Sequence, residues 1–280
     1  MQRFHILTNP IKDKDMTVTA RIRDYLSAQG CTCTSGIFDR SLSDEEYSIP
    51  EGAECVIVPG GDGTMIRVAD LLAGSVPLVG VNLGTLGFLE EIEVDRLDEM
   101  LGRLIRDDFE IEKRMMLSGI VDTEGSQRLH ALNDIVIARN GSLRVLQFEI
   151  YVNDMLLGTY TADGMIVSTP TGSTAYNLSA GGPIVEPDAQ AILLTPICPH
   201  NLNSRAIVLS ADDVVGIRIS EGRYSDVSYA AASFDGYKEI ELKKGQTVTI
   251  RKASIDTRLI KLNRESFLKT LSRKMIEGRT

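Results

Sequence analysis

A glycine-rich segment, Gly60-Gly-Asp-Gly-Thr64, offers the clearest chemistry in this 280-residue sequence. It follows the apolar run Cys55–Val58 and precedes the helical pattern Met65–Ala73. Glycines lack a Cβ atom, so their backbone N–H groups can approach a ligand closely. The N–H groups and the positive dipole at the start of a helix attract phosphate. The segment is therefore predicted to bind phosphate, through Gly61, Gly63 and Thr64.

Asp62 places a carboxylate inside that predicted phosphate site, where its charge would repel the ligand. The carboxylate has a use if it orients, or takes a proton from, a hydroxyl that attacks a phosphoryl group. The structural alternative is a tight strand-to-helix turn, in which Gly and Asp are common. The sequence has neither the GK[ST] ending of a P-loop nor a GxGxxG dinucleotide motif. Asp62 is thus the candidate general base.

A second segment, Asp163–Pro183, is rich in small hydroxyl side chains. Such groups donate and accept hydrogen bonds with little bulk, which suits ribose hydroxyls and the edge of a base. The alternative is an ordinary polar loop. The three histidines lie elsewhere in the sequence, which disfavours a nucleophilic serine. The hydroxyl residues besides Tyr176 are Ser168, Thr169, Thr171, Ser173, Thr174 and Ser179.

Three further polar positions allow two interpretations each. Asn133-Asp134 interrupts the apolar run Ala131–Ala138, so the pair either faces solvent or points into a site. Arg67, five residues after Asp62, and Arg144, after Asn140-Gly141, are either site residues or solvated arginines. For an isolated charged residue, solvent exposure is the more common outcome.

The first hundred residues alternate between strand and helix patterns. Alternation of this kind predicts parallel strand pairing in an open, doubly wound, Rossmann-like sheet. Such sheets bind ligands at the carboxyl ends of their strands, which is where Gly60–Thr64 lies. The expected strands are Phe4–Thr8, Cys55–Val58 and Pro77–Val81, and the expected helices are Met16–Gln29, Met65–Ala73 and Val94–Ile105.

From about residue 113 the pattern changes to short, closely spaced strands, which predict an antiparallel, β-sandwich-like domain. The fold class is therefore α/β plus β, with a Rossmann-like domain over 1–112, a β-rich domain over 113–263 and a last helix within 264–280. That helix is expected over Arg264–Glu277. The expected strands are Met115–Val121, Ala131–Ala138, Val145–Val152, Met165–Thr169, Ala206–Ser210, Val214–Ser220, Ser228–Phe234 and Thr247–Arg251.

The charge balance restricts the function classes. Lys and Arg total 30 and Asp and Glu total 39, a net charge of −9, which disfavours nucleic acid and anionic membranes as partners. No apolar stretch reaches the roughly 18 residues of a membrane span, and no basic leader precedes an apolar run. Four scattered cysteines indicate thiols in a reducing compartment. We therefore expect a cytoplasmic location, with no membrane and no nucleic-acid partner.

Taken together, these segments resemble the NAD kinase family. The glycine-rich GGDGT segment after a strand, the Asn133-Asp134 pair in a later strand and the long segment Asp163–Val185 occur in the family order. Val81–Leu89 and Thr195–His200 resemble two further family segments. GGDGT alone is shared with diacylglycerol, sphingosine and phosphofructokinase-type kinases, whereas Asp163–Val185 is far more specific.

The resemblance implies transfer of the terminal phosphoryl group of ATP, or of polyphosphate in some members, to the adenosine-ribose 2′-hydroxyl of NAD, with a divalent metal such as Mg²⁺. It implies that Asp62 orients and deprotonates this hydroxyl, and that Asn133 and Asp134 bind the base and ribose. Phe88 matches an apolar pocket wall, and the Tyr176 ring is suited to stacking. The other positions that match binding residues of the family are Arg67, Arg144, Asp163, Thr174, Ala175 and Ser179, and Thr171 lies in the same hydroxyl-rich loop.

The family fold pairs a Rossmann-like N-terminal domain with a β-rich C-terminal domain, and its final helix returns to the first domain. Family members form dimers or tetramers whose pockets include residues from a neighbouring subunit. In this sequence Pro196–His200 is expected to form a rigid, exposed loop after an apolar strand. We therefore expect a homodimer or homotetramer, with Cys198 or His200 near the nucleotide of a neighbour.

Two other functions compete with this interpretation. A lipid kinase would share GGDGT, but the acidic charge and the lack of a basic amphipathic helix disfavour a membrane-bound substrate. A catalytically silent, nucleotide-binding regulator would not need Asp62, which the sequence retains. The product formed from labelled ATP with NAD or with diacylglycerol distinguishes the three.

Overall fold

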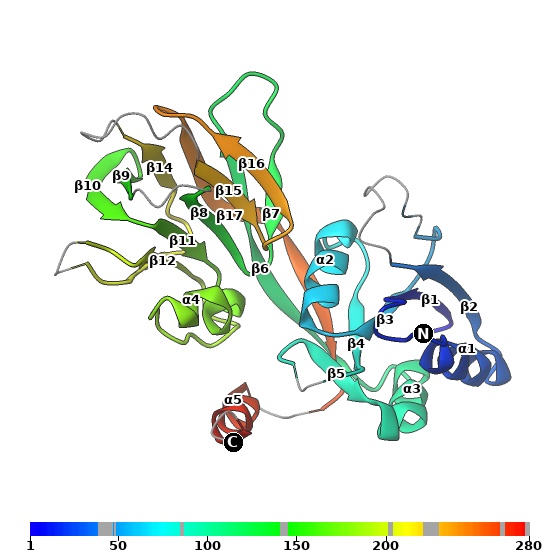
Figure 1. Ribbon diagram of the computed structural model, residues 1–280. Coiled ribbons are helices and arrows are strands. Elements are labelled where there is room, and N and C mark those ends of the chain that lie inside the picture. Colours follow the sequence, from blue (N-terminus) through cyan, green and yellow to red (C-terminus); the bar gives the residue numbers. More distant parts are fainter. Residues whose placement is uncertain are drawn as a thin grey trace. The chain divides into compact units, whose positions relative to one another are not determined.

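The computed structural model describes residues 1–38, 47, 49–84, 87–140, 145–200, 204–220, 230–263 and 267–277. The chain divides into two compact units (Figure 1): Met1–Lys113 with Thr257–Thr280, and Arg114–Asp256. Strands β6 (Glu110–Val121) and β17 (Thr247–Lys261) carry the chain from one unit to the other. Within the described ranges, no helix has the length and apolar character needed to cross a bilayer.

The first unit is built on a parallel sheet. Its strands run in the order β2-β1-β3-β4, and both β5 and the end of β17 also pair with β4. All these pairings are parallel. Every residue of β3 is buried, as expected of a central strand covered on both faces. The strands are β1 (Arg3–Thr8), β2 (Thr32–Ile37), β3 (Cys55–Gly60), β4 (Leu78–Asn82) and β5 (Glu90–Glu93).

Helices cover both faces of this sheet. One core contains side chains of α1 and α3 together with Val79 and Val81 of β4. Helix α2 packs on the opposite face, because Met65 Sδ lies only 2.9 Å from the position of a Cβ atom at Gly80. This arrangement confirms the predicted doubly wound α/β sheet. The helices that belong to this unit are α1 (Thr17–Ala28), α2 (Asp62–Leu72), α3 (Leu97–Ile105) and α5 (Phe267–Glu277), with a 3₁₀ turn η2 (Val94–Arg96).

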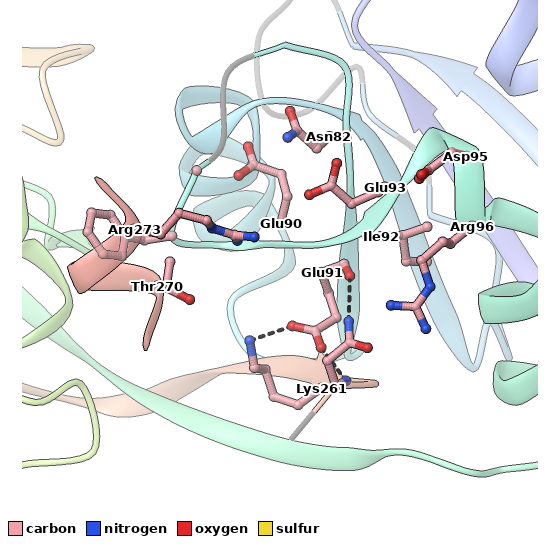
Figure 2. Close-up of a pocket in the computed structure, with 13 residues that line it drawn as sticks. Asn82, Glu90, Glu91, Ile92, Glu93, Asp95, Arg96, Lys261, Thr270 and Arg273 are labelled. Atoms are coloured by element: carbon pink, nitrogen blue, oxygen red, sulfur yellow. Dashed lines mark hydrogen bonds and ion pairs between the residues drawn. The ribbon is translucent and has the colours of Figure 1, made fainter. Parts of the chain in front are cut away.

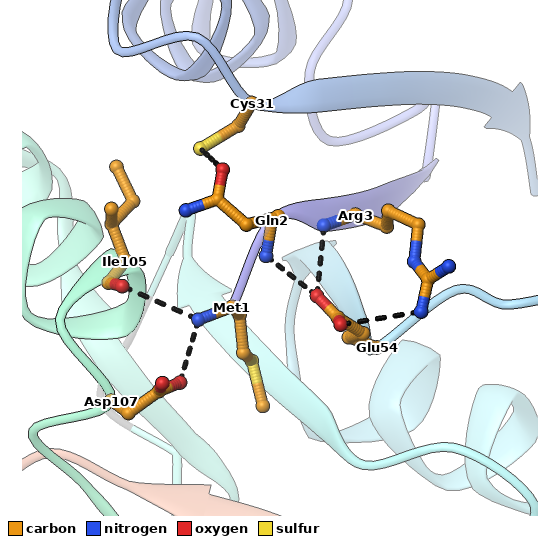
Figure 3. A network of polar contacts seen from close by, with 7 residues as sticks. All are labelled: Met1, Gln2, Arg3, Cys31, Glu54, Ile105 and Asp107. Carbon is orange, nitrogen blue, oxygen red and sulfur yellow. Dashed lines mark hydrogen bonds and ion pairs between the residues drawn. The ribbon is translucent and has the colours of Figure 1, made fainter.

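Polar contacts hold the start of β1 in place (Figure 3). The Met1 ammonium group donates a hydrogen bond to Asp107 at 2.6 Å. The Glu54 carboxylate accepts the backbone N–H groups of Gln2 and Arg3, and these donors lower the pKa of Glu54. Since Glu54 immediately precedes β3, the contacts fix β1 beside the strand that leads into Gly60–Thr64.

The second unit consists of two antiparallel sheets. Part of one has the order β10-β9-β14-β17, and the other has the order β13-β12-β11-β8-β15-β16. They enclose a core that includes Phe148 and Ile217 from the first sheet and Ile137 and Phe234 from the second. The predicted antiparallel, sandwich-like domain is confirmed. The remaining elements are β7 (Leu129–Ala131), β8 (Asp134–Arg139), β9 (Leu146–Val152), β10 (Met155–Ala162), β11 (Gly164–Ser168), η3 (Thr171–Thr174), α4 (Tyr176–Ser179), β12 (Ala191–Ile197), β13 (Ile207–Ser210), β14 (Val215–Ile219), β15 (Ala230–Phe234) and β16 (Lys238–Leu242).

Several predicted boundaries are wrong. Helix α2 begins at Asp62 and not at Met65, because the first turn contains no apolar residue that a periodic pattern would detect. The predicted strand Ala131–Ala138 is interrupted between β7 and β8, where the carboxylate of Asp235 binds the backbone. Pro196 and Ile197 do not belong to an exposed loop, since both are buried in β12.

Four strands have no counterpart in the prediction, namely β2, β5, β10 and β16. Strand β5 explains the difficulty, because its sequence Glu-Glu-Ile-Glu contains a single apolar residue. It forms by pairing with β4, which is a contact that local pattern does not reveal. Residues 228–229 of one predicted strand and 264–266 of the predicted last helix lie outside the described residues.

Candidate active site

The segment Gly60–Thr64 connects the carboxyl end of β3 to the first turn of α2. Gly61 caps the helix with an extended backbone, and its carbonyl accepts the N–H of Thr64 at 2.8 Å. A Cβ atom at Gly60 would lie 2.8 Å from Cβ of Thr64, so the turn needs glycine there. The first N–H groups of a helix have no intrahelical acceptor and remain available to a ligand. The turn thus has the local geometry of a phosphate site.

A cavity of about 340 Å³ lies over this turn. Lys12 and Lys274 both line it, so two cationic side chains border the free N–H groups of the helix. A Cβ atom at Gly63 would meet no atom within 4 Å, which shows that the Gly63 backbone faces open space. The other lining residues are Asn9, Gly60, Gly61, Asp62, Thr64, Asn82, Gly84 and Gly87.

The Asp62 carboxylate is fixed by the backbone that precedes β5. It accepts the N–H of Phe88 at 3.0 Å and the N–H of Leu89 at 2.9 Å. The side chain therefore turns from the helix toward the 87–89 segment and lines the cavity in one defined orientation. Such fixing is what a positioned proton acceptor requires.

Glu90, the first residue of β5, places a second carboxyl group beside Asp62. Burial raises the pKa of Glu90 to about 9, and the charge of Asp62 adds to this increase. The next residue, Glu91, points the other way and binds Lys261 at 2.5 Å (Figure 2). The sequence analysis did not select Glu90, since one glutamate in an acidic run gives no local signal.

In the second unit, the carboxylate of Asp235 holds the Asn133-Asp134 pair. It accepts the backbone N–H groups of Leu132 at 2.7 Å, Asn133 at 2.8 Å and Asp134 at 3.1 Å. Asp134 is 5% exposed, and burial raises the pKa of Asp134 to about 7, with a further contribution from the charge of Asp235. Asn133-Asp134 is therefore not a solvent-facing interruption of a strand.

Most of the predicted hydroxyl groups form the loop itself. Thr169 Oγ1 donates to the Leu132 carbonyl at 2.6 Å, and Ser173 Oγ donates to the Val185 carbonyl at 3.1 Å. Buried Thr171 accepts a hydrogen bond from Arg114 at 3.2 Å. A Cβ atom at Gly172 would lie 2.2 Å from the Asn133 carbonyl oxygen, so only glycine permits this approach. The loop is thus packed against the Asn133 backbone.

A smaller set of loop residues faces outward. Tyr176 is 46% exposed, and Ser179 is also exposed, whereas Thr174 and Ala175 are half-buried. Buried Asn177 holds the turn, because its amide donates to the carbonyls of Ser173 and Pro183. Tyr176 is therefore the accessible aromatic ring of this loop. The Asp163 carboxylate forms an ion pair with Arg139 at 3.0 Å.

Five predicted residues remain, and the structure describes four of them. The Arg67 guanidinium lies 5.3 Å from the centre of the Phe38 ring. The centre of the Phe88 ring lies 5.8 Å from that of Phe267 and 4.2 Å from Lys274 Nζ. Cys198 and His200 are exposed. Arg144 lies outside the described residues.

In each unit, a residue that the sequence analysis did not select contacts the candidate segment. Asn9 donates to Thr64 Oγ1 at 2.9 Å and follows β1, at the same edge of the sheet as Gly60–Thr64. Asp235 has a φ of 50° and precedes Gly236, and an Asp-Gly pair is typical of a hairpin turn. The Asp-Gly pair predicts that turn, but not the binding of a segment about a hundred residues away.

The glycine-rich turn with the local geometry of a phosphate site lies on a parallel sheet, and the second unit is β-rich; this combination is consistent with a nucleotide-dependent phosphotransferase. Two family models match, the ATP-NAD kinase N-terminal domain over residues 39–109 and the ATP-NAD kinase C-terminal domain over residues 132–262. An NAD kinase of Lachnospira eligens is 43% identical over 98% of this chain and 100% of its own length. One of Lachnoclostridium phytofermentans is 41% identical over 98% of this chain and 99% of its own.

Solved structures show the same fold. Yeast NADH kinase complexed with NADH has a TM-score of 0.80 at 23% identity, covering 97% of this chain and 86% of its own. An NAD kinase from Archaeoglobus fulgidus in complex with ATP has a TM-score of 0.78 at 24% identity, covering 98% of each chain. The chain belongs to the ATP-NAD kinase family. This confirms the predicted phosphotransferase class, the ATP-dependent phosphorylation of NAD to NADP.

Proposed function

We propose that Asp62 is the general base of this kinase. In the proposed step the O–H bond of the adenosine-ribose 2′-hydroxyl of NAD breaks, and its proton passes to the Asp62 carboxylate. The ribose oxygen forms a bond to the terminal phosphorus of ATP, and the bond to the bridging oxygen breaks, so ADP leaves with the electron pair. The observation that carries this proposal is the Asp62 carboxylate, oriented by two backbone N–H groups at the edge of a cavity bordered by two lysines.

The donor phosphates are proposed to bind at Gly61, Gly63 and Thr64, with Lys12 and Lys274 balancing their charge. Helix N–H groups and cationic side chains stabilise the charge that develops on a transferring phosphoryl group. We treat Mg²⁺ as part of the donor substrate, because Mg²⁺ in such sites is coordinated largely by substrate phosphates and water. Polyphosphate offers the same anionic groups and remains an alternative donor.

The acceptor NAD is proposed to bind through the second unit. Asn133 and Asp134 are candidates for the ribose and base, since Asp235 fixes their backbone. The exposed Tyr176 ring offers a stacking surface for a base or nicotinamide. Further candidates are Asp163, Thr171, Thr174, Ala175, Ser179 and Arg144, together with Arg67 and Phe88 of the first unit.

A direct assay tests this proposal. The purified chain is incubated with ATP labelled in its terminal phosphate and with NAD, NADH or diacylglycerol, and the products are separated by thin-layer chromatography. Label in NADP supports the proposal. Label in the lipid, or binding of ATP and NAD without transfer, contradicts it.

Location and assembly are further proposals. All four cysteines are free thiols, which agrees with a reducing compartment such as the cytoplasm. The exposed Cys198 and His200 are available for contact with a second subunit, in agreement with the expected homodimer or homotetramer.

A further inference from the structure

The Glu90 and Asp62 carboxyl groups meet above Gly87. A Cβ atom at Gly87 would lie 1.6 Å from Glu90 Oε2 and 2.4 Å from Asp62 Oδ1, so these two oxygens are within about 4 Å of each other. Glu90 Oε1 lies 3.5 Å from the corresponding position at Gly61, in the phosphate-binding turn. Two carboxyl groups from β5 and α2 therefore share one confined volume at the proposed active site.

Both oxygens of Glu90 are buried, and apart from the backbone N–H of Glu90 itself no hydrogen-bond donor among the described residues reaches them. Glu91 differs, because its carboxylate accepts bonds from Lys261 Nζ and from the backbone N–H groups of Leu262 and Asn263. Figure 2 shows the Glu90 side chain on the side of Asn82, away from this Glu91 cluster. The charged groups that act on Glu90 are Asp62 of α2 and, more weakly, Lys274 of α5.

Two carboxylates in one confined volume cannot both be ionised without a large repulsion, which one proton removes. The proton belongs mainly to Glu90, because Asp62 accepts the backbone N–H groups of two other residues, which stabilise its charge, whereas Glu90 has only its own backbone N–H. A protonated carboxyl is a hydrogen-bond donor, and the nearest acceptor is Asp62.

We infer that Glu90 carries a proton in the active enzyme and donates it in a hydrogen bond to Asp62, so that Glu90 acts as a positioning residue for the proposed base. The inference rests on the proposed function of Asp62. The bond would hold one Asp62 oxygen in place and leave the carboxylate oriented toward the cavity. Loss of the Glu90 proton at alkaline pH would place two like charges together and displace Asp62.

Carboxyl ¹³C NMR on protein labelled at the glutamate δ-carbons tests the pair without any measurement of activity. The signal that disappears in Glu90→Gln identifies Glu90. We expect it to titrate near pH 9 in the wild type, and at least one pH unit lower in Asp62→Asn, where the repelling charge is gone. A signal that titrates in the ordinary glutamate range, or one indifferent to Asp62→Asn, overturns the inference. So does a signal that Mg²⁺ alone shifts to the ionised position, since the pair would then be a cation site.

Kinetics test the positioning function. In the wild type, kcat should decrease at alkaline pH as Glu90 loses its proton. Glu90→Gln keeps a donor for Asp62 but cannot ionise, so its kcat near neutral pH should stay within about twofold of the wild type, and the decrease of kcat at alkaline pH should disappear. Glu90→Ala removes the donor and should lower kcat about tenfold, with little change in the KM for ATP.

Glu93→Gln, on the same strand but exposed, is the matched control. An unchanged alkaline decrease in Glu90→Gln contradicts the inference. Wild-type kcat in Asp62→Asn contradicts the proposed function instead, and the NMR signal then still reports whether the pair exists.

Discussion

The carboxylate of Asp235 accepts the backbone N–H of Asn133 at 2.8 Å, although 102 residues separate the two in the sequence. Asp235 lies in the hairpin turn between β15 and β16, and β15 pairs with β8, which begins at Asp134. Strand pairing thus brings a charged acceptor to three N–H groups at the interruption between β7 and β8. The conformation of the proposed acceptor-binding pair therefore depends on a distant turn.

This relationship predicts the effect of Asp235→Ala. The buried N–H groups of residues 132–134 would lose their acceptor, so unfolding free energy should fall by about 1–3 kcal/mol. The KM for NAD should rise about tenfold and the KM for ATP much less. Asp154→Ala is the matched control, since Asp154 also has a positive φ, of 65°, but is exposed in a turn. Equal effects of the two variants on the KM for NAD would contradict the prediction.

Asp62→Asn should lower kcat by at least about 10²-fold, because the amide cannot accept the hydroxyl proton. The KM for NAD should change far less. Asp98→Asn serves as control, since Asp98 lies in the first turn of α3 in the same unit and is exposed. Steady-state kinetics at saturating ATP measure both quantities, and near-wild-type turnover would remove Asp62 from the mechanism.

Gly63→Ala separates folding from phosphate binding. The added methyl group meets no atom within 4 Å, and alanine is favoured in helices, so thermal stability should stay the same or increase slightly. The methyl group would occupy open space at the proposed phosphate-binding turn, so the KM for ATP should rise about tenfold or more. Gly60→Ala should destabilise the fold instead, because its Cβ atom would lie 2.8 Å from Thr64. A Gly63→Ala enzyme with an unchanged KM for ATP would show that donor phosphates bind elsewhere.

The buried carboxyl of Asp134 predicts a dependence of stability on pH. Its pKa in the folded state, about 7, lies above the ordinary value of 3.8, so the folded protein binds more protons than the unfolded chain between these values. The contribution of this group to the free energy of unfolding is therefore fully present below about pH 4 and is lost as the pH rises through 7. The free energy of unfolding falls by at most about 1.4 kcal/mol per pH unit over this range. Urea unfolding of Asp134→Asn should show a weaker decrease over this range than the wild type. The exposed control Asp212→Asn should follow the wild type, and parallel curves for all three proteins would refute the assignment.

Assembly gives a last prediction. We expect a homo-oligomer in light scattering, with Cys198 or His200 of one subunit near the nucleotide of another. Cys198→Asp should weaken association and raise the KM for NAD, because an unpaired charge is costly to bury in an interface. Ser35→Asp, at an exposed position of β2, is a control for charge alone. A fully active monomer at the working concentration would contradict the prediction, as would a Cys198→Asp variant that dissociates but keeps wild-type kinetics.

The sequence alone was enough for the fold class and for the proposed donor site, because both depend on contiguous residues. A strand, three glycines and a helix follow one another in a single segment, so their chemistry can be predicted from spacing. Alternation of strand and helix patterns likewise determined the parallel sheet, and short alternating strands determined the sandwich. The segment Asp163–Val185 carried the family resemblance for the same reason.

Only the tertiary structure decided which polar groups are free to act. Ser168, Thr169 and Ser173 look like binding hydroxyls in the sequence, but they are buried and hold the loop against its neighbours. Glu90 gives no local signal, and the Asp235-Gly236 pair signals only a turn. Glu90 reaches its place because β5 pairs with β4, and Asp235 because β15, which precedes it, pairs with β8. Burial and the proximity of a second carboxylate set the protonation of Glu90 and Asp134, and both depend on distances through space that residue spacing along the chain does not determine.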